Sequence, residues 1–510
     1  MSTAVSEAET VIVETAHGKV RGLQTGGVSV FKGMRYGADT GGPNRFRAPA
    51  PVVPWTGVQD AFEYGHQSPQ MRGPLADKGP MSEDCLRVNV WTPAADDGRR
   101  PVMLWFHGGG FEAGSASQKV YDGTRLALRG DVVVVSINHR LNVFGHCFLG
   151  ERLGSDYATS GNAGYLDLIA AMGWVRENIA AFGGDAENVT IFGQSGGGRK
   201  VSLCYAGHDA QGLFRRGIVQ SGSHLRVQSP EHAARLTDML LAILDIAPDQ
   251  AAKLLAVPTE TLSAAQFKVM RESHSRFSPV LDGLAFQSHP FVPEAPKVSL
   301  DLPMMVGTTR TELSNQLGYE EGVFDLDAAE LQRRLARYVP AEDVYEAIAI
   351  FQAQSPEASP TELYFTITSA RGYVRDQTIM AEQRVLAGAA PTYAYQLTWR
   401  SPADGGRRIS QHTLDLPFMF DNVAKAPHLT GPESEETRAL AQAMSETWIS
   451  FARTGDPNNA AIPAWSPYDL VDRPVMLFDA PCRLAHDPHG AERRFMSRYE
   501  TQQMGRALHR

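Results

Sequence analysis

Residues 189–198 place a serine where it could act as a nucleophile. The segment reads VTIFGQSGGG, so Ser195 lies in a G-x-S-x-G pattern after a short β-branched run and before a predicted helix. Glycines permit the tight, strained strand-to-helix turn that a nucleophilic serine occupies, since larger side chains would clash there. The helix that follows offers free N–H groups to an oxyanion. The alternative is a glycine-rich turn with an incidental serine, but the preceding strand favours the nucleophile.

A second glycine-rich segment could supply those N–H groups. His107 is followed by three glycines, directly after the apolar run VMLWF at 102–106. Consecutive glycines cost conformational entropy, and their use is close approach of the backbone to a ligand, with N–H groups aimed at developing negative charge. A flexible loop is the alternative. An HGGG element after an early strand is the usual complement of a serine in such a turn.

A serine hydroxyl also needs a base, and the base needs a carboxylate to orient it. The chain after Ser195 contains many acidic residues and several histidines. Residue types alone therefore leave both partners open.

The elements that must hold these groups alternate along the chain. Short buried runs predict strands at 102–106, 132–137, 189–192, 217–220, 302–306 and 392–397, and residues 11–31 predict edge hairpins. Apolar spacing predicts helices around 166–174 and 440–451. This alternation predicts an α/β fold with a largely parallel sheet, in one domain spanning 1–510. Two mainly helical stretches, about 228–300 and 319–385, are expected to cover the carboxyl edge of the sheet, where ligands bind.

Composition excludes several classes of protein. The chain has 510 residues, with 48 Lys and Arg against 57 Asp and Glu, a formal net charge of −9. We therefore expect no general nucleic-acid footprint. The four cysteines show no paired spacing that would indicate a zinc site or a disulfide scaffold, and no metal or organic cofactor is implied. No apolar run reaches the roughly 18 residues of a membrane helix, and the first residues do not resemble a signal peptide.

Several longer motifs together resemble those of the type-B carboxylesterases, the serine esterases that include para-nitrobenzyl esterases and cholinesterases. They are HGGGF at 107–111, SEDCL at 82–86 and the stretch 161–198, with RF at 45–46, FSPVLDG at 277–283 and TGDPN at 454–458 in support. The resemblance runs from about residue 10 to residue 490. It implies an α/β-hydrolase fold with helical cap insertions at 228–300 and 319–385, and ester hydrolysis through an acyl-enzyme.

The resemblance also selects the partners of Ser195. The segment VGTTRTE at 306–312 is similar to the loop that carries the family's catalytic acid, which implies Glu312. The segment HTLDLPF at 412–418 is similar to the family's H-x-x-[ED]-L-P-F, which implies His412 as the base. Asp282 is the main alternative to Glu312, weighed lower because the matching DG of the family belongs to a turn.

Further roles are implied in the same way. The N–H groups of Gly109, Gly110 and Gly196 are expected to hold the oxyanion, and Ser221 is similar to a serine that supports the triad from behind. Arg45 with Glu83 and Arg140 with Asp167 look like structural ion pairs. The basic pair Arg199-Lys200 is interpreted as a solvated helix face, and the segment GMRYG at 33–37 departs from the family's GIPYA without a functional account.

Two departures from the family bear on the substrate. The family's GESAGG is GQSGGG here, so neutral Gln194 replaces a glutamate beside the nucleophile, and an attraction for cationic substrates is lost. The cholinesterases also carry a tryptophan before the EDCL cysteine for cation–π binding, whereas no aromatic residue lies between Tyr64 and Trp91. We therefore expect a neutral ester substrate.

One departure bears on the compartment. Cys85 matches a cysteine that forms a disulfide in secreted members, but Ser68 stands roughly where its partner would be and no cysteine precedes Cys85. This favours a cytoplasmic protein.

Three hypotheses about function follow. The first is a serine carboxylesterase for a small neutral ester, acting as a monomer or weak homo-oligomer without nucleic acid or membrane. The second is a hydrolase of carbamate, amide or phthalate-like diester substrates with the same triad. The third is a non-catalytic binding module on this fold, and the apparently complete set of Ser195, Glu312 and His412 argues against it.

Overall fold

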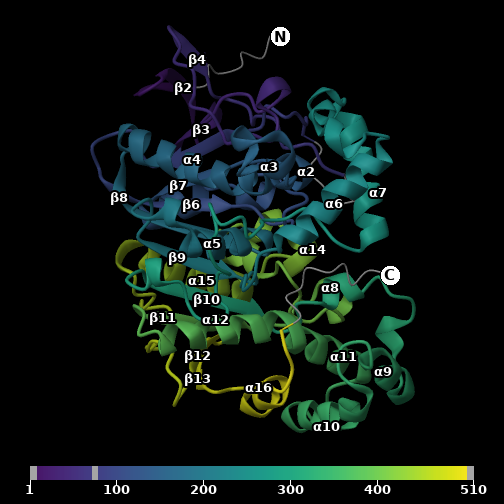
Figure 1. Cartoon of the computed structure of the whole chain (residues 1–510). Helices are drawn as coiled ribbons and strands as arrows, with labels where there is room; N and C mark the ends of the chain where they lie inside the picture. Colours follow the sequence, from purple (N-terminus) through teal and green to yellow (C-terminus); the bar gives the residue numbers. More distant parts are fainter. Residues whose placement is uncertain (1–8, 72–78, 502–510) are drawn as a thin grey trace, which may run out of the picture. The chain divides into compact units, whose positions relative to one another are not determined.

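The structure, a computed structural model, describes residues 9–71 and 79–501 (Figure 1). These residues belong to two compact units. Unit 1 takes its residues from 1–192, 207–216 and 227–289, and unit 2 from 193–206, 217–226 and 290–510. The single domain over 1–510 and the cap formed by 228–300 and 319–385 stay predictions.

Unit 1 contains a mixed set of strands. Their order is β1-β2-β3-β5-β7-β6-β8, with β4 beside β2. The first three strands pair antiparallel, as the predicted edge hairpins at 11–31 require, and β6 pairs with β7 in parallel. The strands are β1 (Thr10–Thr15), β2 (Gly18–Thr25), β3 (Val28–Arg35), β4 (Val58–Asp60), β5 (Arg87–Thr92), β6 (Arg100–Phe106), β7 (Val133–Ile137) and β8 (Gly184–Gln194), whose last two residues lie in unit 2.

Unit 1 also contains six α-helices among its described residues. They are α1 (Thr124–Gly130), α2 (Asn142–His146), α3 (Gly150–Leu153), α4 (Ala163–Asn178), α6 (Pro230–Ile243) and α7 (Thr259–Ser273). Two of them, α6 and α7, lie in the stretch 228–300 that the sequence predicts to be mainly helical. The predicted helix around 166–174 is α4, and its buried side includes Leu168 and Trp174. Side chains of α6 and α7, such as Leu240 and Leu262, pack with Phe144 of α2 in one apolar cluster.

Unit 2 carries the remaining strands in the order β9-β10-β11-β12-β13. The first three pairings are parallel and the last is antiparallel. The strands are β9 (Arg216–Gln220, of which Arg216 belongs to unit 1), β10 (Met304–Thr309), β11 (Thr392–Leu397), β12 (Pro474–Phe478) and β13 (Arg483–His486). At Gly307 of β10 a Cβ atom would lie only 2.2 Å from the Tyr395 ring, so this strand needs glycine beside β11.

The helices of unit 2 include the helix that follows Ser195 and a helical group between residues 314 and 386. They are α5 (Gly196–Ala206), α8 (Ser314–Leu317), α9 (Ala328–Leu335), α10 (Val344–Gln354), α11 (Pro360–Ser369), α12 (Arg375–Leu386), α13 (Asp415–Met419), α14 (Pro427–Thr430), α15 (Glu435–Thr454) and α16 (Gly490–Met496). The predicted helix around 440–451 is α15, which begins with a capping box at Ser434 and ends at Gly455 in a left-handed conformation.

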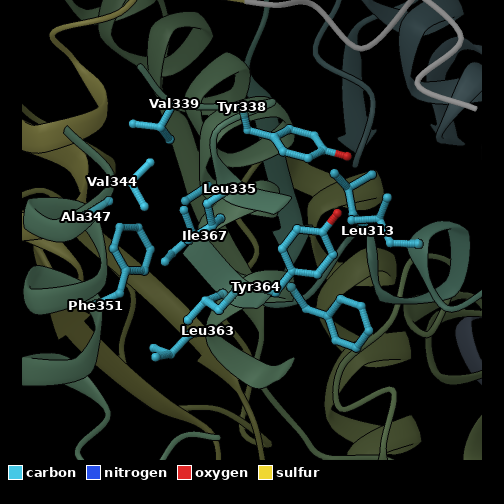
Figure 2. Close-up of a cluster of buried hydrophobic side chains, with 14 of the residues drawn as sticks. Leu313, Leu335, Tyr338, Val339, Val344, Ala347, Phe351, Leu363, Tyr364 and Ile367 are labelled. Carbon is cyan, nitrogen blue, oxygen red and sulfur yellow. The ribbon is translucent and has the colours of Figure 1, made fainter. Parts of the chain in front are cut away.

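A separate apolar core holds α9, α10 and α11 together (Figure 2). Leu335, Phe351 and Ile367 come from the three helices and point into the same cluster. The cluster extends to Tyr373, which lies on a π-helical turn (Ala370–Val374) between α11 and α12. Wide turns of this kind are common at functional sites.

None of the helices in the described part of the chain is long and apolar enough to cross a membrane. Residues 9–71 and 79–501 also contain no group of three or more His, Cys, Asp or Glu side chains that could hold a metal ion.

Candidate active site

Ser195 lies at the turn between β8 and α5, as the G-x-S-x-G pattern predicts. Its φ is +56°, a left-handed conformation that a non-glycine residue adopts at a cost. The Ser195 N–H donates to the carbonyl oxygen of Gln220 at the end of β9, at 2.8 Å. A Cβ at Gly222 would lie 2.3 Å from the Ser195 carbonyl oxygen, so close approach of two loops holds the turn in this strained shape.

Glu312 lies three residues after β10 and is completely buried. Its Oε1 accepts the Thr309 N–H at 2.8 Å, and its Oε2 is hydrogen-bonded to Nδ1 of His412. Both carboxylate oxygens are therefore committed, one to the end of its own strand and one to the imidazole. An acid held in this way can orient a histidine.

His412 lies on a loop that is joined to the Glu312 loop at several points. Ser410 N–H donates to Oγ1 of Thr311 at 2.9 Å, and Asn315 Nδ2 donates to the His412 carbonyl oxygen at 3.3 Å. The imidazole is 4% exposed, and the Tyr373 ring lies 5.1 Å from it between centroids. The structure thus brings together Glu312 and His412, which are 100 positions apart in the sequence.

The Gln194 side chain also contacts the imidazole. Its Nε2 lies 3.2 Å from His412 Nε2 and 3.5 Å from Nδ1. Because these two distances are similar, the amide lies near both ring nitrogens and not in line with the lone pair of Nε2. Among the described residues no hydrogen bond joins Ser195 Oγ to His412. Such bonds often tighten only when substrate binds.

Ser221 and Gly196 are the other residues of the predicted set in unit 2, and Gly196 is the first residue of α5. Ser221 follows β9, is buried and has a φ of +48°. Its N–H donates to the Gly307 carbonyl oxygen at 2.7 Å, while its Oγ is buried with no hydrogen-bond partner in the described part of the chain. Ser221 therefore connects β9 to β10, the strand before Glu312.

Gly109 and Gly110 belong to unit 1, in the loop after β6. Their φ values are +92° and +65°, and a Cβ at Gly109 would lie 2.1 Å from the Ala113 carbonyl oxygen, so glycine is required there. Within residues 9–71 and 79–501 no group accepts a hydrogen bond from the Gly109 N–H. Arg276 pairs with Glu112 of the same loop at 2.8 Å.

Asp282, the alternative acid, stabilises a turn. Its Oδ1 accepts the N–H groups of Leu284 at 3.0 Å and Phe286 at 3.2 Å, and its Oδ2 accepts Nδ2 of Asn162 at 2.8 Å. None of its described contacts is with a histidine. This geometry agrees with the choice of Glu312 over Asp282 as the candidate acid.

The two expected ion pairs are present. Arg45 pairs with Glu83 at 2.5 Å and Arg140 with Asp167 at 2.6 Å, and all four side chains are buried. Both arginines also donate to backbone carbonyl oxygens of other segments, so the pairs anchor loops.

The GMRYG segment has a structural explanation as well. Gly33 has a φ of +69°, the pairing of β3 with β5 shifts between Phe31 and Met34, and Arg35 pairs with Asp84 at 2.5 Å. The segment is a bulge tied to the SEDCL loop.

The interpretation of Arg199-Lys200 as a solvated helix face is wrong. Arg199 is 7% exposed and Lys200 is 1% exposed, because α5 is buried along nearly its whole length. Burial lowers the pKa of the Lys200 ammonium to about 7, and the like charge of Arg199 adds to this effect. Charged residues next to each other in the sequence usually indicate a surface, but here the helix has no open side.

Two residues that contact the candidate site were not singled out by sequence reasoning. Tyr373 reaches His412 from the π-helical turn, and no sequence pattern marks it. Asp415, three residues after His412, is buried within the quoted H-x-x-[ED] segment. Burial raises its pKa to about 6, a hydrogen bond from Gln220 opposes this, and the charge of Glu312 adds to the rise.

Comparisons with known proteins agree with this fold. Over 497 aligned residues the chain is 34% identical to the para-nitrobenzyl esterase of Bacillus subtilis, covering 94% of this chain and 97% of that protein. It is 31% identical to the phenmedipham hydrolase of Pseudarthrobacter oxydans, covering 91% and 94%. The crystal structure of the Geobacillus stearothermophilus carboxylesterase EST55 matches with a TM-score of 0.84 at 36% identity, covering 95% of this chain and 99% of that one.

The protein therefore has the α/β-hydrolase fold, with Ser195 on a strained turn after a strand and a hydrogen-bonded pair of His412 and Glu312. The model of the Carboxylesterase family matches residues 9–496, and the chain belongs to this family, the type-B carboxylesterases. It is a carboxylic ester hydrolase.

Proposed function

We propose that the protein hydrolyses neutral carboxylic esters with Ser195 as nucleophile, His412 as general base and Glu312 as the orienting acid. The hydrogen bond between His412 Nδ1 and Glu312 Oε2 is the observation that carries this proposal. His412 Nε2 takes the proton of the Ser195 hydroxyl while Oγ attacks the ester carbonyl. The tetrahedral intermediate collapses to an acyl-enzyme, and the imidazolium gives its proton to the departing alcohol.

The second half of the reaction repeats these steps with water. His412 takes a proton from the water, the hydroxide attacks the acyl carbonyl, and the Ser195 oxygen leaves with the proton that the imidazolium returns. Glu312 keeps the neutral imidazole protonated on Nδ1 and stabilises the imidazolium. Its burial and its second hydrogen bond to Thr309 support this role, since they leave the carboxylate one orientation.

We propose the N–H groups of Gly109, Gly110 and Gly196 as the oxyanion donors. The positive φ values of Gly109 and Gly110 and the unused Gly109 N–H support this assignment, as does the place of Gly196 at the first position of α5. Removal of one such donor typically lowers kcat by about 100- to 1,000-fold.

The proposal is tested by covalent labelling. A fluorophosphonate should react once per chain, with the phosphonyl group on the peptide that contains Ser195, because only a serine paired with a base attacks it readily. Mass spectrometry of the digested protein locates the adduct. No adduct, or an adduct on another residue, would contradict the proposal and favour the non-catalytic binding module.

A panel of substrates separates the first two hypotheses. It should vary the acyl and alcohol groups of neutral esters and include carbamates, amides and phthalate diesters. It should also include phenmedipham, the compound after which one relative is named. We expect the highest kcat/KM for a neutral ester. A higher value for a carbamate, an amide or a phthalate diester would replace the proposal with the second hypothesis.

Neutral Gln194 supports the preference for neutral substrates. Replacing Gln194 with Glu should raise kcat/KM for a cationic ester relative to a neutral one by roughly 5- to 10-fold, because two unit charges about 7 Å apart gain about 1 kcal/mol at an intermediate dielectric. The measurement compares butyrylcholine with 3,3-dimethylbutyl butyrate, which has the same shape without the charge. Gln24→Glu, on the exposed part of β2, adds the same charge as a control. An unchanged ratio in Gln194→Glu would contradict this account of specificity.

The cytoplasmic location and the monomeric or weakly oligomeric state also remain proposals. The location is supported by the cysteines: Cys85, Cys147, Cys204 and Cys482 are free thiols, and the first three are buried. Free thiols persist in reducing compartments.

A further inference from the structure

Gln220 lies at the point where the turn of Ser195 meets the rest of unit 2. It is the last residue of β9 and is fully buried. Its carbonyl oxygen accepts the Ser195 N–H at 2.8 Å. The position of the Gln220 backbone therefore sets the position of the nucleophile backbone directly.

The side chain of Gln220 is held at both ends of its amide. Its Oε1 accepts the indole N–H of Trp448 on α15 at 3.1 Å, and its Nε2 donates to Oδ2 of Asp415 at 2.6 Å. An indole nitrogen can only donate, so the oxygen of the amide must face Trp448 and the nitrogen must face Asp415. The amide thus has one orientation.

Asp415 carries this connection to the base. It is the first residue of α13, and a tight turn separates it from His412, with Leu414 N–H donating to the Gln411 carbonyl oxygen at 3.1 Å. Thr413 within this turn has a φ of +74°. A short and constrained segment of backbone therefore transmits the position of Asp415 to His412.

The surroundings of Asp415 add an electrostatic effect. The groups that face it are the titratable Glu312, His412 and Tyr395 and the neutral amide of Gln220, with Tyr395 Oη at 3.5 Å from Oδ2. Its pKa near 6 lies above the ordinary 3.8, so the folded protein binds this proton more tightly than the unfolded chain does. The stability from this group is accordingly lost as the pH rises through about 6.

We propose that Gln220 and Asp415 are positioning residues that join the nucleophile turn to the base loop, and that the charge of Asp415 strengthens this connection. The inference rests on the proposed roles of Ser195 and His412. Neither residue touches substrate; both act through the backbone of Ser195 and the loop of His412. Trp448 belongs to the same arrangement, because it fixes the orientation of the Gln220 amide.

The first test removes the connection. Gln220→Ala should lower kcat about 10- to 100-fold with KM changed less than about 3-fold, because a misplacement of about 1 Å between nucleophile and base can cost that much. Gln396→Ala is the matched control: Gln396 is a buried glutamine on β11, which is separated from β9 by β10, and it pairs with His489 at 2.9 Å. The control should keep kcat within about 3-fold. An equal kcat in the two variants, or an effect of Gln220→Ala on KM alone, would overturn the proposal.

Trp448→Phe keeps the proposal testable if Gln220→Ala does not fold. It removes the indole N–H that holds Oε1 of Gln220 and keeps an aromatic ring in place. We expect a smaller loss of kcat in the same direction, about 3- to 10-fold, with KM unchanged. A kcat equal to that of the wild type would count against a role for the fixed amide.

The second test isolates the charge of Asp415. Asp415→Asn keeps an oxygen that can accept from Gln220 but has no proton to lose near pH 6. Below about pH 6, kcat of the wild type should fall more steeply than kcat of the variant, because protonation of Asp415 removes the charge that strengthens its hydrogen bond with Gln220. An identical pH profile in both proteins would overturn the electrostatic part of the proposal.

Labelling distinguishes failure of this inference from failure of the proposed function. Gln220→Ala should still take up one equivalent of fluorophosphonate on Ser195, but more slowly than the wild type. If the wild type itself is not labelled on Ser195, the proposed function fails. If the wild type is labelled and the variant reacts at the same rate, the positioning role of Gln220 is excluded while the proposed function still holds.

Discussion

Ser195→Ala is expected to reduce kcat for a neutral ester about 10⁴- to 10⁶-fold, because no other group in the proposed mechanism can form the acyl-enzyme. Activity somewhat above the rate in water should remain, since the oxyanion donors and substrate binding act without the nucleophile. The measurement is the steady-state hydrolysis of 4-nitrophenyl butyrate, with the burst of the first turnover recorded by rapid mixing. The burst should disappear in the variant.

Ser445→Ala is the matched control for this prediction. Ser445 is a buried serine on α15 whose hydroxyl donates to carbonyl oxygens of its own helix, at 2.6 Å to Ala441. We expect it to keep kcat within about 2-fold of the wild type. A Ser195→Ala protein that is folded, free of contaminating esterase and still shows a burst would exclude Ser195 as the nucleophile.

Glu312→Gln is expected to lower kcat about 10³- to 10⁴-fold with little change in KM. The amide fills the same space, but its NH₂ group can donate to Nδ1 of His412 and so move the imidazole proton to Nε2. In that tautomer the histidine has no lone pair for the Ser195 proton. The loss belongs to the chemical step, so single-turnover acylation should slow by the same factor as kcat.

Glu492→Gln separates this effect from the general cost of changing a buried carboxylate. Glu492 is 2% exposed and pairs with Arg310, two residues before Glu312, at 2.7 Å. The control should lose stability in a denaturant titration and keep kcat within about 3-fold. Glu312→Gln should instead lose kcat and keep most of its stability. If Glu312→Gln retained more than a tenth of the wild-type kcat, another carboxylate would have to orient His412.

The nucleophile turn could be predicted from the sequence because its requirements are local. Four glycines near Ser195 and an apolar run before it determine a strand, a tight turn and a helix within ten residues. The strand itself is longer than predicted: β8 begins at Gly184 rather than Val189, because its first half carries polar residues that resemble a loop.

The pairing of Glu312 with His412 could not be derived from local patterns, because the two residues are distant in the sequence. The family resemblance predicted both residues, and the structure shows their contact. Tyr373 and the burial of Arg199-Lys200 could not be predicted in either way. Both depend on which elements pack around a helix, and tertiary packing overrides local sequence preference.

The four free thiols have a practical consequence for handling the protein. Burial raises the pKa of Cys147 to about 12 and raises those of Cys85 and Cys204 still further, so these sulfurs stay protonated and out of reach of alkylating reagents. Cys482, near the start of β13, is the cysteine with partial exposure. A maleimide dye or a thiol-reactive support should therefore attach the folded protein at one defined position.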